Sequence, residues 1–246
     1  MSVQPQRITW MTATVREVVE ETARVKSVVL DVPVWPGHRA GQHVDVRLTA
    51  PDGYQAQRSY SIASAPEDAA LVLTVERIAD GEVSPYLVDV VVPGDRFEIR
   101  GPIGGHFVWE TSQAGPLVLI GGGSGIVPLR AMLRHRAAQG SDVVTHVVYS
   151  SRSLDEVIYR AEFEQFATSA NLNLYLTLTR ARPPGWSGYA RRIDHDLLAD
   201  VVVPAAEAPH IYICGPTAFV ETAADVCVGL GHAPAHIRTE RFGPTG

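Results

Sequence analysis

The sequence predicts a two-domain protein: an antiparallel β-barrel over residues 1–112, followed by an α/β domain with a parallel sheet over residues 113–246. Two observations predict this division. Up to about residue 110, short segments rich in valine and threonine alternate with Pro and Gly turns, which is typical of a barrel or sandwich. After about residue 113, apolar strands alternate with helix-length segments, which favours a parallel sheet with helices on both faces. The polar segment 110–115 is the expected linker.

Composition and charge exclude several classes of protein. Of the 246 residues, 46% are hydrophobic and 20% charged, as in a soluble globular chain. The net charge of −6 argues against general nucleic-acid binding. The two cysteines, Cys214 and Cys227, are too few for a disulfide framework or for a four-thiolate iron–sulfur centre held by this chain alone. We find no signal-peptide pattern and no apolar run near the ~18–20 residues of a membrane span, so we expect a cytoplasmic protein without membrane contact.

The expected barrel strands show the alternation of a half-buried sheet. Val44, Val46 and Leu48 share one face of a strand, and so do Leu71, Leu73 and Val75. We expect strands over 12–20, 25–32, 43–48 and 71–78. A generic all-β binding domain remains compatible with this pattern.

The second half reads as strand, helix, strand. The expected strands cover 116–120, 143–149, 172–179 and 211–214, and the expected helices cover 128–139, 158–170 and 219–229. The carboxyl ends of such strands meet at one edge of the sheet, which is where open α/β sheets bind ligands.

Three motifs of the first half have side chains or backbone suited to an anionic, planar ligand. Arg58-Ser59-Tyr60-Ser61 offers a guanidinium, an aromatic ring and two hydroxyls, although an edge strand with a surface arginine explains it equally well. Gly81-Glu82-Val83-Ser84, before Pro85, predicts a turn into a helix whose free N–H groups accept an anion, or simply a capped helix. The glycines of 101–107 (GPIGGHF) permit close backbone approach to a ligand, or form a plain β-turn.

Two motifs of the second half lie at the ligand-binding edge of the predicted sheet. The run 121–128 (GGGSGIVP) follows a strand and precedes a helix, which suits a pyrophosphate on a helix N-terminus, although it is not a clean GxGxxG. Cys214-Gly215-Pro216 ends another strand, and its cysteine suits contact with a planar ring better than nucleophilic catalysis. A buried cysteine at a strand end is the alternative.

The second expected strand of this half ends in Ser150-Ser151-Arg152, where many NAD enzymes carry an acidic ligand of the ribose 2′-hydroxyl. Hydroxyls and a guanidinium there favour a 2′-phosphate, and Arg180 after the third strand is expected to reach the same group. A solvated surface charge is the alternative for each arginine. The pattern predicts NADPH, with NADH possible.

The order of these motifs, together with the tail Glu240-Arg241-Phe242-Gly243, resembles the ferredoxin–NADP(+) reductase superfamily over nearly the whole chain. The resemblance implies FAD as cofactor. Arg58 would hold its diphosphate, with Ser59 beside it, Tyr60 would stack on the isoalloxazine, and Ser61 would bond near N5. Glu82, Val83 and Ser84 would hold the diphosphate through backbone groups and the serine hydroxyl.

The resemblance also implies the roles of the remaining site residues. The dinucleotide phosphates would lie on Gly123, Ser124 and Gly125, and the nicotinamide on Cys214, Gly215 and Pro216. Glu240 and Phe242 resemble the acidic and aromatic pair near the flavin, so Ser61, Cys214 and Glu240 are the catalytic candidates. Residues 243–246 continue past Phe242, unlike the plant-type members that end in the covering aromatic. No metal site is expected.

The function implied is hydride transfer from NADPH to FAD, followed by single-electron transfer to a separate ferredoxin, flavodoxin or oxygenase component. The chain would be an oxygenase-reductase type without an iron–sulfur domain. Two alternatives stay open: a redox-silent subunit that senses dinucleotide, and a ferric or free-flavin reductase.

Overall fold

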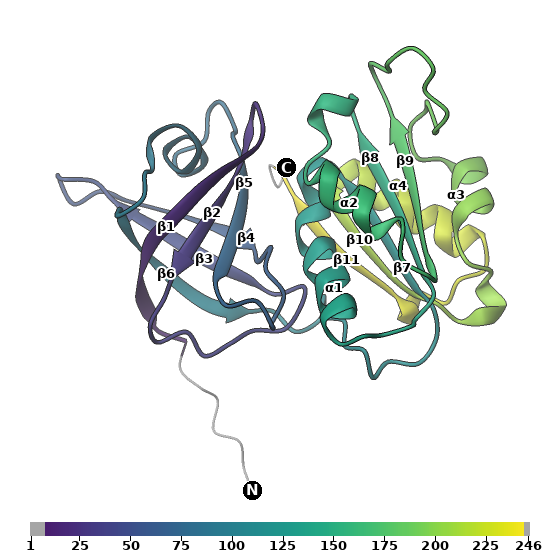
Figure 1. The fold of residues 1–246 in the computed structure, drawn as a ribbon, viewed down its shortest axis with the longest axis horizontal. Helices are drawn as coiled ribbons and strands as arrows, with labels where there is room; N and C mark the ends of the chain where they lie inside the picture. The colour runs from purple at the N-terminus through teal and green to yellow at the C-terminus, as the bar shows by residue number, and fades with distance from the viewer. Residues whose placement is uncertain (1–7, 244–246) are drawn as a thin grey trace, which may run out of the picture.

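A computed structural model of the chain describes residues 8–243, in two sheets that lie side by side (Figure 1). The first is antiparallel and the second parallel with helices on both faces, so the predicted two-domain fold class is confirmed. The predicted boundary between residues 112 and 113 falls in the segment that joins the sheets, and it stays a prediction. The expected tail beyond Gly243 lies outside the described residues.

The first sheet has six strands in the order β4-β3-β6-β1-β2-β5. An antiparallel bridge between Ile62 and Leu73 links the end of β4 to β5 and closes the sheet into a barrel. Apolar side chains that alternate along these strands fill its interior, including the fully buried Ile62, Leu73 and Ile99. The strands are β1 (Trp10–Thr22), β2 (Val25–Asp31), β3 (His43–Thr49), β4 (Gln55–Ser61), β5 (Leu71–Glu76) and β6 (Arg96–Ile103).

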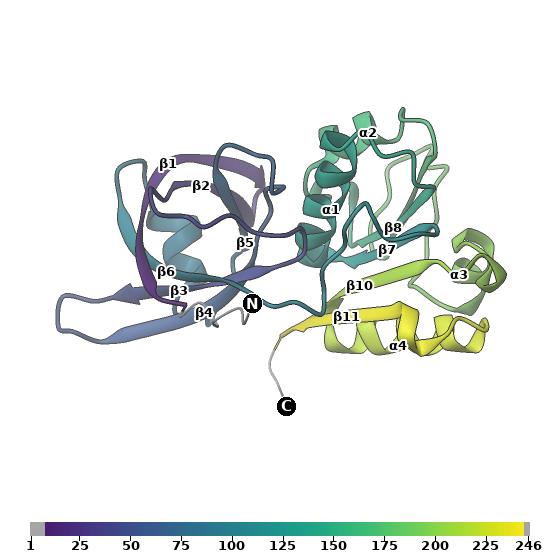
Figure 2. The same cartoon turned by 90° about the horizontal axis from the view of Figure 1, so that it is seen from below.

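The second sheet has five parallel strands in the order β11-β10-β7-β8-β9. Helices α1 and α2 cover one face, and α3 and α4 cover the other (Figure 2). The strands are β7 (Leu117–Gly122), β8 (Thr145–Ser151), β9 (Leu172–Leu178), β10 (His210–Pro216) and β11 (Ile237–Phe242). The helices are α1 (Ile126–Ala138), α2 (Arg160–Phe166), α3 (His195–Val201) and α4 (Thr217–Gly229).

The strand order of the second sheet reverses next to its first strand. After β7 the chain adds β8 and β9 on one side, and it then returns to place β10 and β11 on the other. The carboxyl ends of β7 and β10 therefore lie together at a switch point, where open α/β sheets form their binding crevice. The topology places the glycine motif after β7 and the Cys214 motif of β10 at this crevice.

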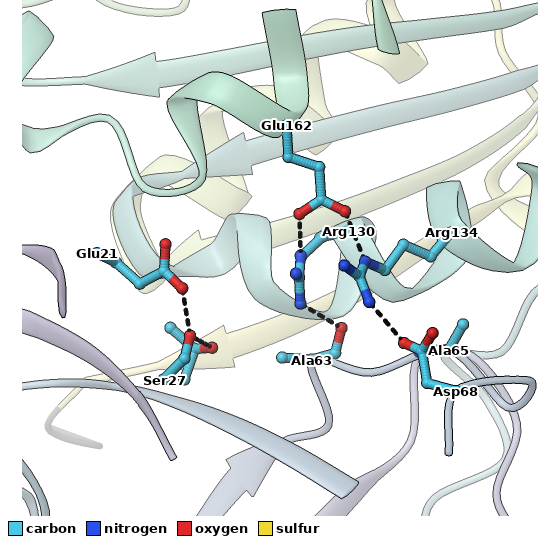
Figure 3. Close-up of polar contacts among 9 residues, drawn as sticks. Glu21, Ser27, Ala63, Ala65, Asp68, Arg130, Arg134 and Glu162 are labelled. Carbon is cyan, nitrogen blue, oxygen red and sulfur yellow. Dashed lines mark hydrogen bonds and ion pairs between the residues drawn. The ribbon is translucent and has the colours of Figure 1, made fainter. Parts of the chain in front are cut away.

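The two domains share one hydrophobic core. Val25, Ala40 and Ala63 of the barrel pack with Leu129 and Met132 of α1 in a single buried cluster. Polar contacts reinforce it from the same helix. The Arg130 side chain donates to the Ala63 carbonyl of the barrel, 3.1 Å away, and to Glu162 of α2, 2.7 Å away (Figure 3). The crevice is therefore held between two domains that are packed against one another.

Several elements differ from the expectation. The helix predicted after Gly81 is a single π-helical turn, η1 (Tyr86–Val90), because the chain becomes extended at Val91. The helix expected over 158–170 is limited to α2, which ends where Ala167 caps it. Strands β6 and β11 and helix α3 were not predicted, and β4 was only the alternative interpretation of the Arg58–Ser61 motif. Within residues 8–243, the helices all lack the length and apolar character required to cross a bilayer.

Candidate functional site

One face of β4 carries an exposed guanidinium beside an aromatic ring. Arg58 and Tyr60 lie two residues apart in this strand, so their side chains point to the same face. Tyr60 is half-buried against the barrel core, whereas 54% of the Arg58 side chain is exposed. The Arg58 Nη2 donates to Oε2 of Glu82 at 2.7 Å. This face of the edge strand offers a cation and a flat apolar surface to a ligand.

At the end of β4, Ser61 meets Glu240 of β11 across the junction of the two domains. The Ser61 hydroxyl donates to Oε2 of Glu240 at 3.5 Å, and Nδ1 of His43 lies 3.8 Å from Oε1. Burial raises the pKa of Glu240 to about 7, and burial lowers the pKa of His43. Both shifts favour the uncharged forms, so below about pH 7 the His43–Glu240 contact is a neutral pair in which the carboxyl holds the proton.

The glycine motif forms a tight turn between β7 and α1. In η2 (Gly123–Gly125), a Cβ on Gly125 would lie 2.1 Å from the Cys214 carbonyl oxygen, so this residue packs directly on β10. Gly123 has a φ of +55°, and no atom lies within 4 Å of where its Cβ would be. Helix α1 then begins without a side-chain cap. The turn thus presents open backbone at Gly123 and an uncapped helix N-terminus, which suit an anion.

A cavity of about 300 Å³ opens in front of this turn and is lined by both domains. The Ser124 hydroxyl donates to Oε2 of Glu76 at 2.8 Å, which links the turn to the end of β5 in the barrel. The barrel contributes residues of the β1–β2 hairpin and β5, namely Thr22, Ala23, Arg24, Val25 and Glu76. The α/β domain contributes strand ends and loops, including Gly122, Gly123, Ser124, Ser150, Ser151, Arg152, Asp155, Glu156, Thr179, Pro216, Phe219 and Phe242.

The side chains of some predicted residues point away from the Arg58–Tyr60 face. The Ser59 hydroxyl donates to Oδ1 of Asp45 at 2.7 Å, on the face of β4 opposite to Arg58 and Tyr60. Val83 is fully buried in the barrel core, and the Ser84 hydroxyl accepts from the Ile78 N–H at 3.1 Å. Of the second motif, only Glu82 brings its side chain to Arg58.

Arg152 lines the cavity together with two acidic residues. Its Nη1 lies 3.3 Å from Oε2 of Glu156, and Asp155 lines the same space. The backbone N–H of Arg180 donates to the Arg152 carbonyl at 2.9 Å, so the two predicted arginines are neighbours. This part of the cavity therefore combines the Arg152 guanidinium with two carboxylates.

Cys214 packs against the glycine turn at Gly125 and is 1% exposed. Burial raises the pKa of its thiol well above the ordinary value, so the sulfur is neutral and is neither an acid–base group nor a nucleophile. It pairs in register with Glu240 on β11 and with Gly121 on β7. Pro216 and Phe242, also paired in register, form the adjacent wall of the cavity.

Sequence reasoning missed several residues at the site. His43 reaches Glu240 from β3, and Arg24 reaches the cavity from a hairpin of the other domain, positions that no local motif marks. Asp155 and Glu156 follow Arg152 closely in the chain. Their position just after the strand could have predicted that they lie at the same site.

The residues present fit both expected cofactors. An exposed guanidinium, an aromatic ring and a hydroxyl at the strand end suit the diphosphate and ring of a flavin dinucleotide. The space in front of Gly123, the uncapped start of α1 and the cavity suit a second dinucleotide. In the part of the chain that the structure describes, no three His, Cys, Asp or Glu side chains are placed to hold a metal ion.

Comparisons with known proteins agree with this geometry. The oxidoreductase FAD-binding domain matches residues 13–109, and the oxidoreductase NAD-binding domain matches residues 119–225. The chain is 32% identical to ferredoxin–NADP reductase B of Sorangium cellulosum, over 82% of this chain and 84% of that protein. It is 29% identical to the glycine betaine monooxygenase reductase subunit of Pseudomonas aeruginosa over 93% of its length, but it spans only 63% of that relative.

A solved structure extends the likeness to three dimensions. The FAD/NAD-binding domain of nitric oxide dioxygenase from Vibrio cholerae superposes with a TM-score of 0.85 at 27% identity, covering 95% of this chain and 99% of that one. The two-domain arrangement of this chain is thus shared with that solved structure.

Proposed function

Because the chain belongs to the ferredoxin–NADP(+) reductase superfamily, we propose that it is an FAD-dependent NADPH reductase that delivers electrons to a separate acceptor protein. The observation that carries the proposal is the Ser61–Glu240 contact, which brings the end of β4, next to the Arg58–Tyr60 face, against β11, whose Phe242 lines the cavity. Two bound dinucleotides would have their reactive ends at this junction.

The proposed division of labour follows from the site. When bound, FAD would accept a hydride and release its electrons one at a time. Arg58 would hold the diphosphate, and Tyr60 would cover the ring. Gly123, Ser124 and the start of α1 would bind the phosphates of NADPH, while Arg152 and Arg180 would bind its 2′-phosphate.

The proton at the junction would be held by this chain. The Ser61 hydroxyl and the protonated Glu240 carboxyl would be donors at the edge of the proposed flavin site. Cys214 would contribute only its shape under the nicotinamide, because its thiol is neutral and buried. Phe242 would form the wall of the cavity at its nicotinamide end.

We further propose that the acceptor is a ferredoxin, a flavodoxin or an oxygenase component. The support is the relatives' own names, which include a monooxygenase reductase subunit and a ferredoxin reductase. The chain spans 63% of the former and 84% of the latter.

The test is spectroscopic. The purified chain should be yellow, and NADPH added without oxygen should bleach its visible absorption. A yellow protein that NADPH leaves unchanged would instead indicate a redox-silent sensor. If the enzyme reduced ferric chelates or free flavin but not ferredoxins or flavodoxins, it would be a ferric or free-flavin reductase, and the proposed protein acceptor would be wrong.

A further inference from the structure

An exposed tyrosine at the tip of the β3–β4 hairpin is held in a fixed orientation. Tyr54 is 58% exposed. Its N–H donates to Oδ1 of Asp52 at 3.0 Å, and its carbonyl accepts from the Ala50 N–H at 2.8 Å. Its hydroxyl donates to Oε1 of Glu82, a residue of a different loop. The ring is thus constrained at its backbone and at its hydroxyl while its faces remain accessible to a ligand.

The carboxylate that holds Tyr54 also holds Arg58. Glu82 accepts from the Tyr54 hydroxyl through one oxygen and from Arg58 Nη2 at 2.7 Å through the other. The phenol and the guanidinium therefore lie on either side of a single carboxylate. A phosphate bonded to Arg58 would be a few ångströms from the edge of the Tyr54 ring.

The order of groups along the barrel edge matches the order of groups in a flavin dinucleotide. Strand β4 runs from the hairpin tip to the domain junction, as both ribbon views show (Figures 1 and 2). Tyr54, Arg58 and Tyr60 are separated by even numbers of residues, so in this extended segment they point to the same face. With the flavin ring at Tyr60 and the diphosphate at Arg58, the adenosine end continues toward Tyr54.

We propose that Tyr54 is the platform on which the adenine of FAD stacks, and that it makes the chain select FAD over FMN. This inference rests on the proposed function for the flavin ring and diphosphate. Adenine presents a flat π surface, and stacking on an aromatic side chain that is already oriented costs little ordering entropy. The adenine of NADPH is a different ligand, because Tyr54 is absent from the residues that line the 300 Å³ cavity.

The test compares Tyr54→Ala with Tyr54→Phe in the full chain, freed of flavin and titrated with FAD and with FMN. The Ala variant should bind FAD about tenfold more weakly, within the range for base–aromatic stacking, and FMN within about twofold of wild type. The Phe variant keeps the ring, so its FAD affinity should stay within about threefold. NADP⁺ affinity should not change in either variant.

Tyr189→Ala provides a matched control, because Tyr189 also donates its hydroxyl to a carboxylate, that of Asp200, in the other domain. It should leave the affinity for both flavins unchanged, and circular dichroism verifies the fold of every variant. Equal loss of FAD and FMN affinity in Ala and Phe would overturn the inference, since Tyr54 would then act through Glu82 and Arg58. An unchanged FAD affinity in the Ala variant would overturn it too. Failure of the wild type to bind either flavin would instead defeat the proposed function first.

Discussion

At the scale of single residues, burial decides the protonation of the domain junction. Glu240 comes from an exposed-looking tail sequence, yet only 26% of its side chain is exposed and burial raises its pKa to about 7. No nearby cation compensates, because burial also lowers the pKa of His43. The sequence motif identified this carboxyl, but its protonation depends on packing between two domains, which no local pattern encodes.

This raised pKa predicts a pH-dependent stability. The folded protein binds more protons than the unfolded chain between the ordinary carboxyl pKa of 4.5 and about 7. The stability is therefore full below that window and is lost as pH rises through the folded-state pKa. Glu240→Gln should reduce the difference in unfolding free energy between pH 5 and pH 8 by about 2 to 3 kcal/mol, measured by urea denaturation. An undiminished difference would show that Glu240 ionises normally.

A second prediction at this scale concerns Arg152, which Glu156 holds at 3.3 Å. Glu156→Gln should free the guanidinium and lower the KM for NADPH about three- to tenfold, whereas Arg152→Ala and Arg180→Ala should raise it at least about tenfold. The KM for NADH should stay within about twofold in steady-state assays. Arg160→Ala is the control, because its exposed pair with Glu164 contributes little. Equal effects on both coenzymes would remove the proposed 2′-phosphate site.

At the scale of elements, the turn between β7 and α1 combines two glycines with different requirements. Gly125→Ala would force a Cβ to 2.1 Å from the Cys214 carbonyl, so we expect it to destabilise the protein by about 3 kcal/mol or more. In Gly123→Ala the new Cβ contacts no atom, so the destabilisation comes only from the positive φ and should be about 1 kcal/mol. Its methyl group would project into the cavity and weaken NADP⁺ binding. Thermal unfolding and NADP⁺ titration separate the two effects, and equal destabilisation would contradict this account.

Most elements were predictable, and the exceptions share physical causes. Long apolar or alternating segments such as β2 and β7 were predicted because the hydrophobic pattern of their own residues indicates a strand. Strand β11 (IRTERF) is charged and half-exposed, so its pairing with β10 alone defines it. Strand β6 ends in Gly101-Pro102, which reads as a turn, and α3 has only seven residues. The site residues of these elements, above all Glu240, were found through motif order and not through secondary structure.

At the scale of the whole molecule, the domain interface combines a shared apolar core with a network of charges. Arg130 and Arg134 of α1 both donate to Glu162 of α2. They also reach the barrel, at the Ala63 carbonyl and at Asp68 (Figure 3). The side chain of Arg130 is only 10% exposed, so its partners are required to offset its desolvation.

Removal of Glu162 should therefore be costly. We expect Glu162→Ala to destabilise the protein by about 2 to 3 kcal/mol, because it leaves Arg130 buried with only the Ala63 carbonyl. Amide exchange should accelerate in residues 63–70 and in α1. Glu164→Ala, which breaks only the exposed pair with Arg160 on α2, should stay within about 0.5 kcal/mol. Similar losses in both variants would show that the network is not structural.

The common core of barrel and α/β domain limits how this protein can be recombined. Cutting the chain in the segment between the two sheets would expose Val25, Ala40 and Ala63 on one piece and the apolar side of α1 on the other. Neither piece would be a soluble module ready for grafting. A chimaera that imports a relative's coenzyme half would need the donor's Arg130, Arg134 and Glu162 counterparts matched to the recipient's barrel loop, or it would trade altered coenzyme preference for aggregation.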